Sequence, residues 1–244
     1  MSETSSRWIP LESNPDVLNQ WAEKAGLVLQ QDRFVDVYGL DPELLAMVPQ
    51  PVDAVILLFP ITDAIEARAK QEDERIKLEG QHPIDPTVFY IKQTISNACG
   101  TIGLLHALAN SHATFVPDSP LALFIDQCRD KTPEERAKLL ETTPLFANIH
   151  AEAASSGQTA VPSAEAKVDL HFTCFVQAPN PPRSVTEWPH PLHLIELDGR
   201  RAGPIDRGLS KNLLEDVATF VKNNYMSQTA SMEFSMIALA SSEG

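Results

Sequence analysis

The sequence has little cysteine, little positive charge and no long hydrophobic run. Its three cysteines form neither a disulfide framework nor a metal-binding motif. Lysine and arginine total 19 against 33 acidic residues, a net charge of −14, which disfavours nucleic acid because phosphates would be repelled. No apolar run reaches the roughly 20 residues of a membrane-spanning helix, and residues 1–6 lack the basic and apolar regions of a signal peptide. We expect an intracellular protein, cytoplasmic with the nucleus as an alternative, that binds neither nucleic acid nor membranes.

The remaining composition is typical of a folded protein, with 43% hydrophobic and 21% charged residues in 244. This length is compatible with one domain, which we place at 1–244. Runs rich in β-branched and aromatic residues predict strands at 34–38, 52–59, 168–177, 192–198 and 233–240. Helical spacing and capping signals predict helices at 15–25, 41–47, 62–79, from 99, and at 120–128, 132–141, 144–150 and 211–222. Because helices and strands mix without regular alternation, we predict an α+β fold, a central antiparallel sheet with helices on both faces.

Two segments do not fit regular elements. Residues 151–167 are small, polar and aperiodic, which predicts a mobile loop. Residues 178–191 contain several closely spaced prolines, which exclude a regular central strand. We therefore predict an enlarged hairpin loop there, between two strands.

Cys99 is the strongest candidate for a reactive residue, because it lies in a polar turn just where an apolar helix begins. The partial positive charge at a helix N-terminus favours thiolate over thiol. A single cysteine before a helix is more often a core residue, so the interpretation depends on partners elsewhere in the chain. Cys128 and Cys174 lie among apolar neighbours and are interpreted as packing residues.

Three further residues supply what a thiol nucleophile needs. His171 lies in one predicted buried strand and Asp198 ends the next, so antiparallel pairing would let the carboxylate orient the imidazole. Gln93 precedes Cys99 by six residues, and its side-chain amide can donate to an oxyanion together with the Cys99 backbone N–H. The chain order Cys, His, Asp is that of papain-like thiol hydrolases.

Five segments of the chain, at 7–15, 34–39, 93–103, 150–172 and 196–200, resemble the ubiquitin C-terminal hydrolases, which are small papain-like deubiquitinating enzymes. The resemblance extends from Trp8 to about Ala240. It implies a papain-like fold with a knotted backbone, an exception to the usual rule. It also implies that Cys99 is the nucleophile, His171 the general base and acid, Asp198 its orienting partner and Gln93 the oxyanion donor. The loop at 178–191 departs from the tight hairpin of the family's smallest members.

The resemblance also implies contacts with ubiquitin. Acidic residues at the positions of Glu12, Asp16 and Asp36 recognise the basic tail of ubiquitin in the family, and Leu11 is a candidate hydrophobic contact if it is exposed. The loop at about 151–167 is expected to cross over the cleft as a size filter for leaving groups. An ordinary surface connector is the alternative for this loop.

We therefore predict a cysteine-dependent hydrolase that cleaves amide, ester or thioester bonds at the C-terminal glycine of ubiquitin, or of a ubiquitin-like modifier, and favours small or unfolded leaving groups. It needs no cofactor or metal in this interpretation, and we expect a monomer. One alternative is a protein that sequesters free ubiquitin with slow turnover. Another is a thiol amidase or acyltransferase for small substrates. His106 is interpreted as a satisfied core histidine, with a contact that supports the catalytic residues as the alternative. His190 and His193, without visible metal partners, receive no role.

Overall fold

The computed structural model describes residues 7–159, 168–179, 181 and 191–242. Its centre is a six-stranded antiparallel sheet in the order β1-β6-β2-β3-β4-β5. The strands are β1 (Asp32–Asp36), β2 (Val52–Pro60), β3 (Leu170–Pro179), β4 (Leu192–Leu197), β5 (Ile205–Ser210) and β6 (Ser235–Ser241). The last strand, β6, thus lies between β1 and β2. Within the described chain, strand β1 therefore joins the sheet only through its pairing with the C-terminal strand.

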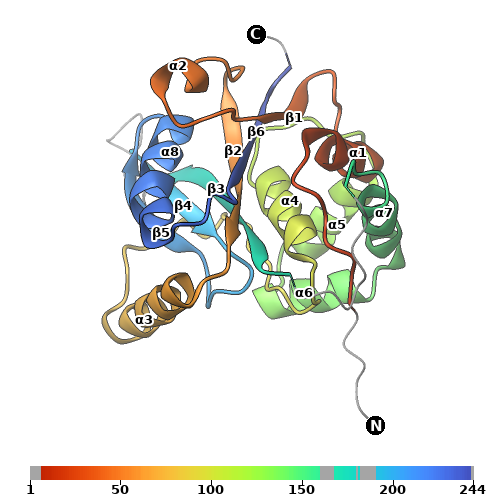
Figure 1. Ribbon diagram of the computed structural model, residues 1–244. Helices are drawn as coiled ribbons and strands as arrows, with labels where there is room; N and C mark the ends of the chain where they lie inside the picture. The colour runs from red at the N-terminus through yellow and green to blue at the C-terminus, as the bar shows by residue number, and fades with distance from the viewer. Residues whose placement is uncertain (1–6, 160–167, 180, 182–190, 243–244) are drawn as a thin grey trace.

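Helices cover both faces of this sheet, which confirms the predicted α+β fold class (Figure 1). One face carries α1 (Pro15–Ala25), α4 (Cys99–Ala109), α5 (Pro120–Cys128), α6 (Pro133–Glu141) and α7 (Pro144–Ala154). The other face carries α2 (Pro42–Leu45), α8 (Leu213–Asn224) and the first turn of α3 (Asp63–Glu79), with a 3-10 helix, η1 (Met226–Gln228), after α8. Among the described residues, none of the helices is long and apolar enough to cross a membrane.

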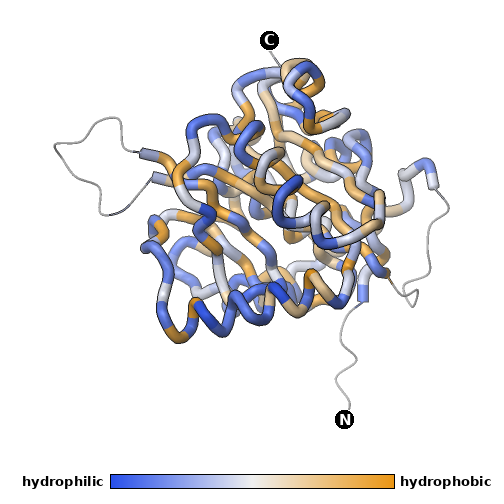
Figure 2. Tube along the Cα trace, turned by 60° about the vertical axis from the view of Figure 1, so that its left-hand side comes forward, coloured by the Kyte–Doolittle hydropathy of each residue, from blue (hydrophilic) through white to orange (hydrophobic). Residues whose placement is uncertain are grey.

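The alternation of side chains along the central strands creates two hydrophobic cores. On β2, Ala54 and Ile56 pack with α4 and its neighbours, whereas Val55, Leu57 and Phe59 pack on the side of α8. Successive side chains of a strand point to opposite faces of the sheet, so a strand buried on both faces must be apolar throughout. Figure 2 shows this distribution, with hydrophobic segments along the interior strands and hydrophilic ones on the outer helices.

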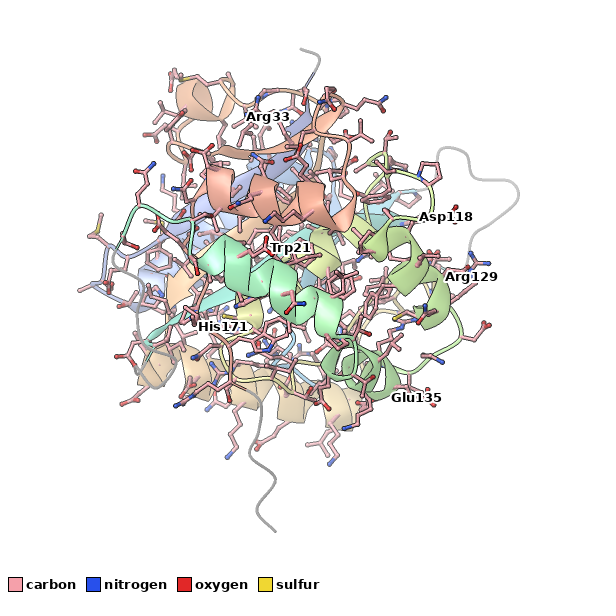
Figure 3. The ribbon with its side chains drawn as sticks, turned by 90° about the vertical axis from the view of Figure 1, so that its right-hand side faces the viewer. Trp21, Arg33, Asp118, Arg129, Glu135 and His171 are labelled. Atoms are coloured by element: carbon pink, nitrogen blue, oxygen red, sulfur yellow. The ribbon has the colours of Figure 1, made fainter. Side chains whose placement is uncertain are left out.

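Helix ends follow the predicted capping signals. Asn14 caps α1 by accepting from the backbone N–H of Asp16, and Gly26 ends the helix with a positive φ of 118°, a conformation that glycine adopts without strain. Thr132 and Glu135 form the predicted capping box of α6. Trp21 of α1 lies between α1 and α7 (Figure 3), where its ring stacks on Phe146. Local signals thus set the helix ends, and aromatic packing joins the helices.

The structure differs from the sequence-based expectations in three places. Strand β5 was not predicted, because its sequence is polar and includes Gly208, whose φ is 96°. Helix α7 continues to Ala154, into the range expected to be a loop, and β3 continues to Pro179 at the hairpin. The remainder of the two predicted loops, 160–167 and most of 180–190, lies outside the described residues.

Candidate active site

Cys99 is the first residue of α4, and its side chain is buried in the middle of the molecule at 8% exposure. The chain enters the helix through Asn97, which has a φ of 62° and donates from its side-chain amide to the backbone carbonyl of Trp8. The N-cap residue, Ala98, offers no side chain to the first turn. The positive end of the α4 dipole therefore lies at the sulfur without a competing side-chain acceptor from the cap.

The sheet register brings His171 and Asp198 together. Strand β3 pairs with β4 so that Cys174 lies opposite Leu197, which carries Asp198, the next residue, toward the start of β3. His171 Nε2 lies 2.7 Å from Asp198 Oδ1, and both side chains are buried. A hydrogen bond between His171 and Cys99 contributes to the pKa shifts of both groups. Three of the four predicted catalytic residues thus form one chain of contacts.

The electrostatics of this group favour an ion pair between sulfur and imidazole. Burial alone would raise the pKa of Cys99, but the hydrogen bond and charge of His171, with a backbone hydrogen bond from Phe172, bring that pKa below its ordinary value. Burial would lower the pKa of His171, but the charge and hydrogen bond of Asp198 raise it well above its usual range. The Asp198 carboxyl is likewise buried, yet His171 keeps its pKa low. Neighbouring charge therefore outweighs desolvation at all three groups.

A network of hydrogen bonds fixes the turn that carries Asp198. The backbone N–H of Arg200 donates to Asp198 Oδ1 at 2.8 Å. The Tyr90 hydroxyl oxygen lies 2.9 and 2.8 Å from the backbone carbonyl oxygens of Asp198 and Arg201, within reach of its one donated hydrogen bond. Sequence reasoning missed Tyr90, because nothing in its local sequence indicates a contact with a turn more than a hundred residues later. Such anchoring holds a catalytic carboxylate in one orientation.

Gln93 lies beside the same turn. Its backbone N–H donates to the carbonyl of Gly199 at 2.9 Å, and a Cβ at Gly199 would come within 3.0 Å of Gln93 Cβ. The side-chain amide of Gln93 donates to the carbonyl of Ile95 at 3.3 Å, whereas its buried Oε1 has no partner among the described residues. The structure thus ties Gln93 to the Asp198 turn, and its role as oxyanion donor stays a prediction.

The three acidic residues predicted to bind a basic tail line one groove. Glu12, Asp16 and Asp36 surround a groove of about 470 Å³ near the start of α1 and the end of β1. Partial burial, with the charge of Asp16 as the second cause, raises the pKa of Asp36. Such mutual repulsion is relieved when a cation enters. Apart from the family resemblance, nothing in the sequence indicates that these residues lie together. Asp36 on β1 comes close to Glu12 and Asp16 only in the folded chain.

Glu12 also holds the start of the predicted crossover segment. Its Oε2 accepts from the backbone N–H and the hydroxyl of Thr159 at 2.9 and 2.6 Å, and these hydrogen bonds lower the pKa of Glu12. Thr159 was not among the predicted site residues. The contact links the acidic groove to the chain that precedes residues 160–167.

The expectation that Leu11 is exposed is wrong. Leu11 is 6% exposed and packs on Gly100 in the first turn of α4, where a Cβ at Gly100 would meet its side chain at 3.0 Å. The glycine lets the N-terminal segment approach α4 closely, because a Cβ at this position would require the Leu11 side chain to move. Leu11 and Cys99 instead line the same cleft of about 750 Å³, which also includes Glu12 and Ser13 of the acidic groove. The groove and the cleft that contains the sulfur are therefore neighbours that share Glu12 and Ser13.

His193 has partners that the sequence did not reveal. Its Nδ1 lies 2.6 Å from Asp206 Oδ2, and its ring stacks on that of His82 at a centroid distance of 4.6 Å. These three side chains are the one group within the described residues in which histidine, cysteine or acidic ligands converge closely enough for a metal ion. The group is separate from Cys99, His171 and Asp198, so it does not belong to the thiol chemistry.

A cysteine at the start of a buried helix, paired with a histidine and an aspartate from adjacent strands, defines a cysteine-type hydrolase of papain-like arrangement. Comparison with known proteins gives the family. A profile of "Ubiquitin carboxyl-terminal hydrolase, family 1" matches residues 8–227, and the chain belongs to this family of cysteine-type peptidases.

Relatives from distant organisms match over nearly the whole chain. Ubiquitin carboxyl-terminal hydrolase 3 of Arabidopsis thaliana is 41% identical, covering 98% of this chain and 96% of its own. Ubiquitin carboxyl-terminal hydrolase isozyme L1 of Homo sapiens is 38% identical, covering 94% of this chain and 96% of its own. The Trichinella spiralis UCH37 catalytic domain, solved bound to ubiquitin vinyl methyl ester, shares the fold with a TM-score of 0.68 at 19% identity, covering 98% of both chains.

Proposed function

We propose that the chain cleaves the bond after the C-terminal glycine of ubiquitin, with ubiquitin as its protein partner. The observation that carries this proposal is the hydrogen-bonded chain from Cys99 through His171 to Asp198, in a family whose relatives are named for ubiquitin hydrolysis. A relative of the same fold was solved with a ubiquitin derivative bound. The acidic groove, which shares Glu12 and Ser13 with the Cys99 cleft, gives the proposed partner a place to bind beside the sulfur.

In the proposed reaction, the Cys99 thiolate attacks the glycine carbonyl carbon and forms a tetrahedral intermediate. His171 then donates its proton to the leaving amine or thiol, which departs and leaves a thioester between Cys99 and ubiquitin. Water, deprotonated by His171, attacks that thioester and releases the carboxylate product and the thiol. Asp198 stabilises the imidazolium at each stage, as its low pKa and 2.7 Å hydrogen bond favour. An alcohol leaves by the same steps when the substrate is an ester.

Two donors are proposed for the oxyanion, the backbone N–H of Cys99 and the side-chain amide of Gln93. The Cys99 N–H lies at the start of α4, where helix N–H groups point outward without partners. Gln93 now donates to Ile95, so the role requires its amide to turn toward the substrate carbonyl. The hydrogen bond to Ile95 is long, at 3.3 Å, so breaking it costs little free energy. The amide also has a second N–H that it can donate.

The acidic groove is proposed to bind the basic tail of ubiquitin. That tail carries arginines before its final Gly-Gly, and Glu12, Asp16 and Asp36 present three carboxylates around one groove. The net charge of −14 adds long-range attraction for a basic partner. A glycine pair suits the narrow approach, because Cys99 is 8% exposed and a larger side chain would obstruct the carbonyl.

A preference for small or unfolded leaving groups is proposed from the ends of the crossover segment. Thr159 and Val168, the described residues on either side of 160–167, both line the Cys99 cleft. Glu12, which lines the same cleft, also binds Thr159. The segment expected to limit the leaving group, 160–167, lies outside the described residues, so the proposal is supported only by the residues that flank it. The proposal predicts similar binding of all ubiquitin conjugates but slower release of folded ones.

The decisive experiment compares a reporter amide attached to the C-terminus of ubiquitin with the same amide on a free Gly-Gly peptide. We expect kcat/KM to be larger for ubiquitin by several orders of magnitude, and Cys99→Ala to abolish turnover while ubiquitin binding persists. Retained hydrolysis by Cys99→Ala would refute the nucleophile. Equal rates on the two reporters would favour an amidase for small substrates, and tight binding without turnover would favour sequestration of free ubiquitin.

Localisation and oligomeric state are proposed on simpler grounds. All three cysteines are free and buried, and Cys99 must stay reduced to act, which suits the cytoplasm or nucleus. We also propose a monomer that acts alone on its partner, because the catalytic group is complete within one chain.

A further inference from the structure

We propose that His82, His193 and Asp206 form a binding site for Zn²⁺ or a similar transition-metal dication, separate from the thiol site. The three ligand atoms lie within 4.8 Å of one another. They come from three parts of the chain: the loop after α3, strand β4 and strand β5. A bound ion would therefore tie that loop to the edge of the sheet.

The donor set selects the class of ion. Two imidazole nitrogens and one carboxylate oxygen suit Zn²⁺, whereas Mg²⁺ and Ca²⁺ prefer oxygen ligands throughout. Three protein ligands leave one position of a tetrahedral ion for water. His82 is exposed, which gives the ion and its water a route to solvent.

Binding requires local rearrangement of the three ligands. Zinc bonds of about 2.0 to 2.1 Å place two ligands of a tetrahedral ion roughly 3.3 Å apart. His193 Nδ1 and Asp206 Oδ2, now 2.6 Å apart, must separate slightly as the ion replaces the proton between them. His82 must turn its ring out of the stack with His193, and any other contact of its exposed side chain has to give way to the ion.

The surrounding hydrogen bonds hold the ligands in place. Asp206 Oδ1 accepts from the backbone N–H of Gly208 at 2.6 Å, which orients the carboxylate. Gln81, the neighbour of His82, accepts from the backbone N–H of Asp206 at 3.0 Å and donates to the carbonyl of Pro204 at 2.9 Å. The loop is thus fastened to β5 beside its ligand. Such supporting contacts commonly change metal affinity by about 10- to 100-fold.

The site also has a structural relation to catalysis. His193 and Asp198 lie on the same short strand and the turn after it. Gln81 and His82 border a cavity of about 860 Å³ that reaches His171 and Asp198. An ion at His193 would therefore stabilise the edge of the sheet from which the Asp198 turn extends.

The test measures Zn²⁺ binding to the untagged full chain by calorimetry, in the Cys99→Ala background so that the Cys99 and His171 pair cannot capture the ion. We expect one Zn²⁺ per chain, bound with a Kd of micromolar or tighter, and a raised thermal unfolding temperature. Adding His82→Ala should weaken binding by at least tenfold and abolish the thermal shift. Asp206→Asn is the second variant, in case removal of an exposed ring alone leaves partial binding.

The matched control is His112→Ala. His112 is an exposed histidine that also contacts a carboxylate, Asp53, at 3.3 Å, but it lies in no three-ligand group within the described chain. We expect Zn²⁺ binding by this variant within twofold of the background protein. No binding at 100 µM Zn²⁺ would overturn the proposal. So would equal weakening by His112→Ala and His82→Ala, or affinity unchanged by both His82→Ala and Asp206→Asn.

Discussion

His171 and His106 are both buried, yet their surroundings shift their pKa values in opposite directions. His106 lies within α4, where Nδ1 contacts the carbonyl of Leu197 at 3.1 Å and Nε2 contacts the backbone of Ile91. Burial lowers its pKa to about 4. His171 has a carboxylate and a thiol as partners, which raise its pKa in spite of burial. A buried histidine is therefore charged only where the fold supplies an anion.

The two histidines differ in role as well as in charge. Neutral His106 joins Leu197, the residue before Asp198, to Ile91, which is two residues before Gln93. Its ring nitrogens are thus satisfied within the core, and through the same contacts it supports the segments that carry Asp198 and Gln93, so the structure fits both readings of this histidine. Charged His171 lies between Cys99 and Asp198. Three changes test this distinction and a fourth tests the acidic groove, taken from the largest expected effect to the smallest.

Asp198→Asn removes the anion and makes the surroundings of His171 resemble those of His106. We expect kcat to fall by about 10³ to 10⁴, as for orienting carboxylates in comparable triads. The pKa of His171, measured by NMR in the Cys99→Ala background, should fall below its ordinary value because burial then dominates. The His106 pKa serves as the internal reference and should stay low. An unchanged His171 pKa would contradict the assignment of Asp198.

Gln93→Ala tests the wall that His106 supports. Loss of one oxyanion donor is expected to lower kcat about a hundredfold, or roughly 3 kcal/mol, with little change in KM. Thr94→Ala, at the neighbouring position, provides a matched control and should leave kcat within severalfold. A rise in KM with unchanged kcat in Gln93→Ala would indicate that this side chain binds substrate and does not stabilise the transition state.

His106→Gln tests the neutral histidine through the pH dependence of stability. The folded pKa of about 4 lies below the unfolded value, so the unfolded chain binds the proton first as the pH falls. The contribution of His106 to stability is thus present above about pH 6.5 and declines toward pH 4. At pH 5 this loss amounts to about 2 kcal/mol relative to pH 7.5. Urea unfolding of the variant should lack this part of the acid destabilisation.

His150→Gln is the control for that experiment. His150 is also buried, contacts Thr101 and the carbonyl of Ile9, and has a pKa lowered by burial to about 4. We therefore expect His150 to cause a similar loss of folding stability as the pH falls, additional to that from His106. Identical pH profiles for His106→Gln and the unchanged protein would mean that His106 titrates normally, and the comparison with His171 would fail.

The sequence allowed much of the site to be predicted, because the signals were local. Cys99 at a helix start, His171 in a buried strand and Asp198 at the end of another were visible as patterns, and antiparallel pairing explained how the last two meet. The resemblance to a known family supplied the acidic residues of the groove. Glycine and capping residues likewise marked the ends of α1 and α6.

What could not be predicted depends on contacts between distant segments. Leu11 is buried because Gly100 leaves space above α4, a fact with no local sign at residue 11. Strand β5 escaped detection because Ile205–Ser210 is polar, and an edge strand needs no alternating apolar face. His193 lacked visible partners because His82 and Asp206 reach it only through the fold. Local sequence patterns indicate which side chains of a segment are buried, but they do not indicate which distant segment packs against them.

Asp36→Ala tests the groove outside the buried site and should have the smallest effect. Asp36 is partly exposed on β1, so solvent and salt screen its attraction for a basic tail. We expect KM for a ubiquitin reporter to rise severalfold at low ionic strength with kcat unchanged, and the difference to shrink as salt increases. Asp126→Ala removes the same charge from exposed α5, where the carboxylate pairs with Arg129. Both variants alter the net charge equally. An equal rise in KM would therefore mean that only the overall charge matters. A rise confined to Asp36→Ala would show that the groove recognises the basic tail.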